Sequence, residues 1–155
     1  NVDMVGVLKS ILEAIRKLSK ELKIVFPVHP RTREKIKEFN LEYVMKPFSL
    51  VGPLPYLDMV CLMGQARLIL TDSGGIQEEA TILGIPCVTM RENTERPATI
   101  EEGTNLLGGN QGAGIWLAAS NILKSGGKKG SVPDLWDGKA ANRIVKILSS
   151  WTPPG

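Results

Sequence analysis

The stretch from Leu68 to Glu79, LILTDSGGIQEE, constrains the fold more than any other part of the sequence. Its apolar run predicts a buried strand, its two glycines a turn, and the residues after them the start of a helix. Gly74 and Gly75 can take positive φ and let a ligand approach the main chain closely. The unpaired amides at the positive end of the helix would then bind an anion, and phosphate is the natural ligand.

The two carboxylates that follow fall on different sides of the expected helix. At about 100° per residue, Glu79 lies about 60° from Ile76, at the edge of the packed face, whereas Glu78 points to solvent. Glu79 would sit about 5 to 6 Å below the first amides, where it could accept hydrogen bonds from both hydroxyls of a ribose attached to the phosphate. The alternative is that both acids only complement the helix dipole.

Helical and strand patterns alternate along the chain without an obvious linker. This predicts an α/β fold, a Rossmann-like parallel sheet with helices on both faces. Helices are expected at 7–22, 32–39, 56–66, 76–83, 113–124 and 139–151, strands at 23–28, 67–71, 86–90 and 104–107, and a short extended piece at 43–46. The last helix should turn Ile144, Ile147 and Leu148 inward. Ligands of such sheets bind beyond the carboxyl ends of the strands, which is where His29, Ser73 and the loop 91–96 are expected.

Length and charge indicate one compact domain rather than a nucleic-acid or membrane protein. The 155 residues are 43% hydrophobic, enough for a real core, and 19 Lys and Arg balance 16 Asp and Glu. The basic residues of 31–37 alternate with Glu34 and Glu38 at helical spacing, which favours a solvated helix face over a nucleic-acid patch. No apolar run is long enough for a membrane span and no signal peptide opens the chain, so a cytoplasmic protein is expected.

Metal and disulfide chemistry are not indicated. Cys61 and Cys87 stand among apolar residues without CxxC spacing, so both are expected to be buried free thiols. His29 is the single histidine, and no His and Cys cluster can form a structural zinc site.

The segment from Thr71 to Asn110 strongly resembles the corresponding part of UDP-N-acetylglucosamine 2-epimerases, including the non-hydrolysing enzymes of bacteria and archaea. Three further motifs stand in the order found in that family: PVHPR at 27–31, the loop 53–56, and TERP at 94–97. The resemblance therefore covers nearly the whole chain.

The resemblance implies that residues 1–155 are a single UDP-binding domain, the carboxy-terminal half of a two-domain enzyme of the glycosyltransferase-B type. Asn1, Val2 and Asp3 look like the end of a family motif that contains an active-site histidine, so the chain is expected to begin just after it. The amino-terminal catalytic domain, with the acidic residues that move the C2 proton, has no counterpart here. Family members commonly form homodimers.

The implied reaction is interconversion of UDP-N-acetylglucosamine and UDP-N-acetylmannosamine, an isomerase activity that serves cell-envelope polysaccharide biosynthesis. UDP is eliminated to give a glycal and then added back at the anomeric carbon, without a metal or redox cofactor. This half would hold the departing diphosphate. Because the bases at C2 would come from the other half, the 155 residues alone are expected to bind UDP weakly and not to turn over.

The resemblance also assigns roles to single residues, and each has a plain alternative. Ser73 would donate to the β-phosphate or simply cap the helix. Arg96 would steady the diphosphate with its planar fork or form a surface ion pair with Glu95 or Glu92. His29 would lie near the nucleotide sugar or bond only to nearby main chain. Met59 stands where many members place an aromatic residue against uracil, so it would pack on the base or serve ordinary helix packing.

Three other functions stay open from the sequence. A nucleotide-sugar glycosyltransferase of similar architecture would also bind its donor near a glycine turn and a glutamate. A hydrolysing epimerase would release free N-acetylmannosamine. A stand-alone nucleotide-binding module would lack catalytic residues altogether.

Overall fold

The computed structural model describes residues 1–152, and all its strands pair in parallel. β1 (Val25–Pro27) pairs with β2 (Ser49–Val51) in one sheet, with Phe26 opposite Leu50. The second sheet has the order β3 (Ile69–Thr71), β4 (Cys87–Thr89), β5 (Asn105–Leu107). The predicted α/β class with parallel strands is confirmed.

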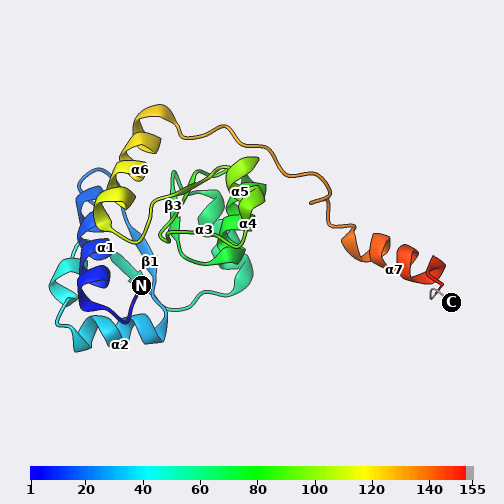
Figure 1. Cartoon of the computed structure of the whole chain (residues 1–155). Helices are drawn as coiled ribbons and strands as arrows, with labels where there is room; N and C mark the ends of the chain where they lie inside the picture. Colours follow the sequence, from blue (N-terminus) through cyan, green and yellow to red (C-terminus); the bar gives the residue numbers. More distant parts are fainter. Residues whose placement is uncertain (153–155) are drawn as a thin grey trace.

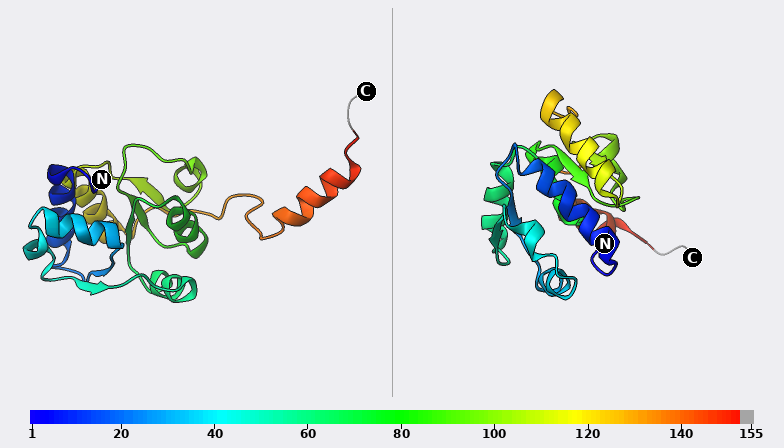
Figure 2. Two further views of the ribbon diagram at one scale, coloured as in Figure 1. Left: turned by 90° about the horizontal axis from the view of Figure 1, so that it is seen from below. Right: turned by 90° about the vertical axis from the view of Figure 1, so that its left-hand side faces the viewer.

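Helices cover both faces of the strands, and two neighbouring residues of β3 show why. Ile69 packs with Met63 and Ala80, which belong to α3 (Tyr56–Gly64) and α4 (Gly74–Leu83). Leu70 points the other way, as alternate residues of a strand do, and packs on the cluster of α1 (Val5–Leu18) and α6 (Gly112–Ser125). The prediction of helices on both faces is therefore confirmed (Figure 2).

Three short elements and the end of the first helix differ from the sequence expectation. The piece at 43–46 is not extended but lies in a 3₁₀ turn, Glu42–Met45, because its adjacent residues Val44 and Met45 are both buried, which a strand cannot achieve on one covered face. β2 and the helix α5 (Pro97–Glu101) were not expected. The first helix ends at Leu18 rather than near residue 22.

The last helix, α7 (Ala140–Ser150), stands away from the rest of the molecule (Figure 1). The segment 126–139 contains neither helix nor strand and carries α7 outward. The prediction that Ile144, Ile147 and Leu148 face inward is wrong, since they are 55%, 63% and 66% exposed.

The helix α2 (Pro30–Glu38) begins at a proline, where a missing N–H costs nothing. Within residues 1–152, no helix combines the length and apolar character that a membrane span requires.

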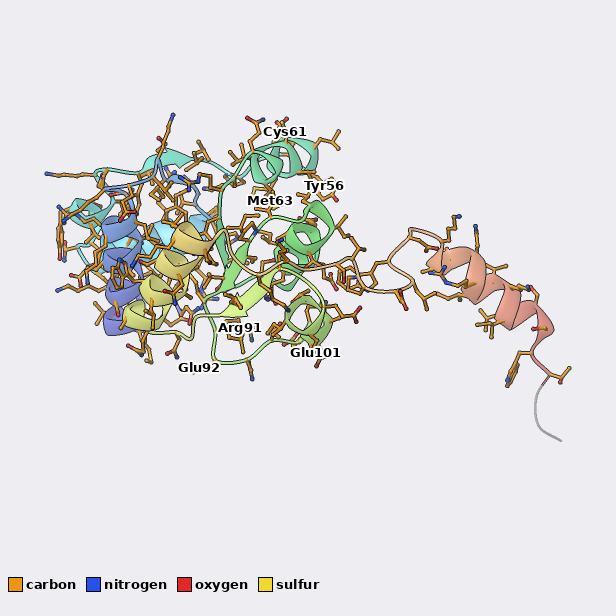
Figure 3. The ribbon with its side chains drawn as sticks, turned by 90° about the horizontal axis from the view of Figure 1, so that it is seen from above. Tyr56, Cys61, Met63, Arg91, Glu92 and Glu101 are labelled. Carbon is orange, nitrogen blue, oxygen red and sulfur yellow. The ribbon has the colours of Figure 1, made fainter. Side chains whose placement is uncertain are left out.

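The two cysteines behave differently. Cys87 is fully buried in β4, as expected, and burial raises the pKa of its thiol to about 12. Cys61 is exposed, so the prediction of burial is wrong. Figure 3 shows it on the outside of α3, whereas Met63 lies on the side facing the strands. Its sequence neighbours are apolar, but residues one apart on a helix face different directions.

Candidate functional site

α4 begins directly behind the end of β3, and the turn between them is made by Asp72 and Ser73. Ser73 holds the N-cap position in extended conformation (φ −85°, ψ 128°), and its main-chain N–H donates to Thr71 Oγ1 at 3.0 Å. Gly74 and Gly75 are the first helical residues, and neither takes the positive φ that is open to glycine. Neither glycine has a Cβ, so no side chain of theirs covers the first amides of the helix.

The hydroxyl of Ser73 is not used by the helix that it precedes. Its side chain makes no capping hydrogen bond within the described chain, and the residue is exposed. The plain alternative, a capping serine, is therefore not what the structure shows. A free hydroxyl and the unpaired first-turn amides face the same solvent-accessible turn. Together with the positive helix end they favour an anion with several acceptor oxygens.

Arg96 lies across this turn. A Cβ at Gly74 would meet Arg96 Nε at 3.6 Å, so the guanidinium is in ordinary contact distance of the helix start. Its Nε forms an ion pair with Glu78 Oε1 at 2.8 Å, and both side chains are about two-fifths exposed, at 42% and 37%. Arg96 thus has an ion-pair partner, but it is Glu78 rather than Glu95 or Glu92, and Glu78 does not point freely to solvent.

The loop that carries Arg96 follows β4. Figure 3 shows Arg91 and Glu92 in this loop, on the side of the strands away from α3. Arg91 is 4.0 Å from Glu95, and Glu92 accepts from the main-chain N–H of Asn110 at 3.3 Å. The loop is therefore held by one contact within itself and by one hydrogen bond to the segment after β5.

A buried polar network fixes the loop to α4. Thr94 Oγ1 donates to Gln77 Oε1 at 2.5 Å and accepts from the main-chain N–H of Arg96 at 3.0 Å. Gln77 is 1% exposed, and its oxygen also accepts from Asn105 Nδ2 at 3.3 Å. Asn105 donates to Thr99 Oγ1 at 3.0 Å as well, and that hydroxyl donates to the carbonyl of Arg96 at 2.7 Å.

Sequence reasoning missed this network entirely. The available signal was a set of polar residues at positions that should be buried: Gln77 next to Ile76 on the motif helix, and Asn105 directly before two leucines of the strand β5. Buried amides must find hydrogen-bond partners, so each pointed to a partner elsewhere. A single sequence does not reveal that Gln77 pairs with Thr94, because Gln77, Asn105 and Thr94 lie on different elements.

Glu79 lies half-buried on α4, at the edge of the packed face as expected. Among residues 1–152 it has no ion-pair or hydrogen-bond partner at its carboxylate. Its oxygens are therefore available to hydroxyl donors of a ligand that sits on the helix start.

The other two candidates lie on separate elements. His29 caps α2, with Nδ1 accepting from the main-chain N–H of Arg31 at 3.3 Å, which is the plain alternative for this residue. Met59 packs against the cluster of Met63, Ile69, Ala80 and Cys87, so ordinary helix packing describes it. The structure thus gathers Ser73, Gly74, Gly75, Glu79 and Arg96 at one helix end, and among residues 1–152 no hydrogen bond or ion pair joins His29 or Met59 to them.

Metal ligation has no visible basis at this site. Within the described residues, no three His, Cys, Asp or Glu side chains lie close enough together to hold a metal ion. At the start of α4 the Ser73 hydroxyl, the main-chain amides and the Arg96 guanidinium can all donate hydrogen bonds, which suits an anion rather than a cation.

The chain is similar to one family along almost its whole length. The family model described as UDP-N-acetylglucosamine 2-epimerase matches residues 1–149. Enzymes of that name from Methanocaldococcus jannaschii and Methanococcus maripaludis are 42% and 40% identical over 154 and 153 residues, which cover 96% of this chain. Those residues are 42% and 41% of the relatives, so the chain spans about two-fifths of their length.

Solved structures give the same result. The crystal structure of Methanocaldococcus jannaschii UDP-GlcNAc 2-epimerase in complex with UDP-GlcNAc and UDP matches with a TM-score of 0.86 and covers 96% of this chain and 42% of that one. The Neisseria meningitidis UDP-GlcNAc 2-epimerase bound to UDP-GlcNAc matches with a TM-score of 0.78 at 33% identity, covering 93% and 40%. These enzymes have the glycosyltransferase-B-type fold, which confirms the predicted fold class.

Proposed function

Because the chain belongs to the UDP-N-acetylglucosamine 2-epimerase family, we propose that it is the carboxy-terminal, UDP-binding half of an enzyme that interconverts UDP-N-acetylglucosamine and UDP-N-acetylmannosamine. The assignment of UDP binding to the start of α4 rests on one observation. The Arg96 guanidinium lies against Gly74 at the start of α4, beside a serine hydroxyl that the helix does not use.

In this proposal the diphosphate lies on the first turn of α4. Ser73 and the amides of Gly74 and Gly75 donate to the β-phosphate, and Arg96 donates to the diphosphate from the side. Glu78 holds Nε of Arg96, and Nη1 donates to the carbonyl of Glu95 at 3.2 Å, so the fork is positioned before a ligand arrives. A planar, pre-oriented fork loses less freedom on binding than a lysine would.

The nucleoside would extend along α4 toward Glu79, whose carboxylate accepts hydrogen bonds from the two ribose hydroxyls. The half-burial of Glu79 and its lack of a partner among residues 1–152 support this role. The roles of His29 beside the nucleotide sugar and of Met59 against the base stay predictions.

The chemistry divides between two halves. A base removes the C2 proton while the bond from C1 to the UDP oxygen breaks, which gives a glycal and free UDP. Addition of UDP at C1 and of a proton to the opposite face of C2 gives the epimer. This chain would stabilise the negative charge on the departing UDP, and electrostatic assistance of this kind is usually worth several kcal/mol. Proton transfer needs groups from an amino-terminal half, so this chain alone is proposed to be inactive.

The wider setting follows from the family alone. We place the enzyme in the cytoplasm, in the supply of amino sugars for cell-envelope polysaccharides, and as a homodimer. No cofactor is required by the elimination route.

The test is calorimetric titration of the chain with UDP, CDP and ADP, together with the Glu79→Ala variant. We expect UDP to bind most tightly and the variant to lose about tenfold in affinity, because a carboxylate that accepts two hydrogen bonds is removed. Incubation with UDP-N-acetylglucosamine in D₂O should give no deuterium at C2. Clear turnover, or equal binding of all three nucleotides by both proteins, would contradict the proposal.

A further inference from the structure

The strand β2 is paired on one side only. Its partner is β1, no other strand of residues 1–152 pairs with its second edge, and Figure 2 shows it at the margin of the molecule. The main-chain N–H of Ser49 donates to the carbonyl of Ile24 at 2.8 Å. The carbonyl of Val51 accepts from the N–H of Val28 at 3.1 Å. The residue between them, Leu50, therefore turns its N–H and carbonyl to the open edge, which is a template for a further strand.

A pocket of about 300 Å³ opens beside this edge. Its floor is apolar, since Ile36, Met45 and Phe48 are at most 7% exposed, whereas Leu50 at the rim is 43% exposed. Phe48 packs in one cluster with Ile36 of α2. Because Phe48 and Leu50 are alternate residues, both side chains lie on the face of β2 that α2 covers. A residue placed opposite Leu50 would therefore put its own side chain over the pocket.

The rim of the pocket is positively charged. Arg33 and Lys37 reach it from α2, and Lys46 reaches it from the end of the 3₁₀ turn. All three side chains are exposed, and none of them forms an ion pair among residues 1–152. Glu42 is the one acid in the described lining, and the acids of α2 do not belong to it. Three cations against one acid, around an apolar floor, favour a partner that is acidic and carries an apolar side chain.

We propose that the open edge of β2 and this pocket, together the edge site, bind an acidic peptide in extended conformation. The peptide adds an antiparallel strand, the more stable kind of pairing, in which one residue exchanges both main-chain hydrogen bonds with Leu50. That residue places an apolar side chain in the pocket. Acidic residues two positions before and after it lie on the same face and reach Arg33, Lys37 and Lys46.

The open edge decides between polypeptide and nucleic acid. Both are attracted by cations, but only a polypeptide offers the alternating N–H and carbonyl groups that continue a ladder. The edge site shares no residue with the start of α4, so this inference goes beyond nucleotide binding and does not depend on it.

The probe is a capped peptide of nine residues, Glu-Thr-Glu-Thr-Leu-Thr-Glu-Thr-Glu, whose leucine and glutamates share one face of a strand. We expect it to bind the 155-residue chain and, at saturation, to slow hydrogen exchange of the Leu50 amide at least tenfold. One control peptide has lysine in place of glutamate, which tests charge. The other has an N-methyl group on its leucine, which removes a ladder donor but keeps the side chain. Each control is expected to bind at least tenfold more weakly.

Two matched variants separate the edge site from general charge effects. Lys37 and Lys17 are both exposed lysines in the last turn of a helix, so a change to glutamate alters the net charge and the helix-end interaction alike. We expect Lys37→Glu to weaken peptide binding at least fivefold and Lys17→Glu to leave it unchanged.

Four results would overturn the proposal. They are no binding of the acidic peptide, equal binding of either control peptide, protection of other amides only, and the same loss in both variants. A DNA oligonucleotide of equal charge is the last comparison. If it protected the Leu50 amide as strongly as the peptide, the surface would recognise charge alone and the assignment to a peptide would be wrong.

Discussion

Nε of Arg96 lies 2.8 Å from Oε1 of Glu78, and this pair joins the loop after β4 to the first turns of α4. Both side chains are about two-fifths exposed, so the pair contributes little to stability, about 1 kcal/mol at most. The main effect of the pair is to position the Arg96 side chain. The guanidinium is held over Gly74, where a bound diphosphate would need it.

Glu78→Gln tests the charge of this pair. The amide oxygen can keep the contact with Arg96 Nε, while a negative charge next to the proposed diphosphate is removed. We expect UDP to bind about threefold more tightly at low salt, and the gain to shrink at high salt. The control is Glu95→Gln, because Glu95 is 78% exposed and its contact with Arg91 is long, at 4.0 Å. Weaker binding of UDP to Glu78→Gln in calorimetry would contradict the charge argument.

Ser73→Ala separates binding from helix capping. A capping serine usually contributes about 1 kcal/mol, but the Ser73 side chain makes no capping bond within the described chain, so the free energy of unfolding should change by less than about 0.3 kcal/mol. UDP affinity should fall about tenfold, since a hydrogen bond to a charged group is lost. Urea unfolding and calorimetry measure the two effects. Ser125→Ala, at the far end of α6, serves as the control and should change neither affinity nor nucleotide preference.

Thr94→Val tests whether the buried network positions Arg96. The variant removes the donor to Gln77 and the acceptor for the Arg96 main chain, and should cost about 1 to 2 kcal/mol of stability. UDP affinity should fall at least fivefold, because the loop is no longer held to α4.

Thr104→Val is the matched control for this variant. Its hydroxyl donates to the carbonyl of Ile85 at 2.7 Å, away from the loop, so the stability cost is similar. We expect unchanged UDP affinity. If the two valine variants lose affinity equally, the network is structural and does not position Arg96.

Cys87 should give the folded chain a specific pH dependence. Burial raises the pKa of its thiol from 9.0 to about 12, so folding favours the protonated form. Its contribution to stability is complete below pH 9 and is lost as the pH rises from 9 to 12. Urea unfolding at pH 8 to 11 measures this, and the Cys87→Ala variant should show a flatter profile. At pH 8, iodoacetamide should label only Cys61 in the folded chain, and labelling of both thiols would contradict the burial of Cys87.

The sequence predicted the elements whose apolar spacing is long and regular. α1, α4 and α6 repeat apolar residues at helical intervals, and their existence was predicted correctly. β2 was missed because Ser49 interrupts the apolar residues there, so it lacks the longer apolar run that surrounds β1, β3 and β4. The end of α1 at Leu18 was missed because Leu22 continues the apolar pattern beyond the helix.

Amphipathic spacing explains the error in α7. Ile144, Ile147 and Leu148 share one face of the helix, and that pattern predicts a need for a partner surface. The pattern does not predict that this partner surface lies within the same 155 residues. The structure carries the helix outward on the segment 126–139, and the apolar face stays exposed.

The candidate site was predicted in part. The positions of Ser73 and Glu79 followed from the strand–glycine–helix pattern, because local geometry alone decides them. The pairing of Arg96 with Glu78 and the contacts of Gln77 could not be predicted, because they depend on how a loop folds back over a helix. The glycines can take positive φ, but the structure makes the turn with the extended Ser73 instead.

The most direct measurement of the central claim is the set of amide chemical shifts of the ¹⁵N-labelled chain during titration with UDP. The account predicts that the amides of Gly74, Gly75 and Ile76 shift with UDP and not with uridine, which lacks the diphosphate. The same three amides should respond less in Arg96→Lys, which loses the planar fork. UDP shifts that leave Gly74 and Gly75 unchanged while mapping to another surface would contradict the account.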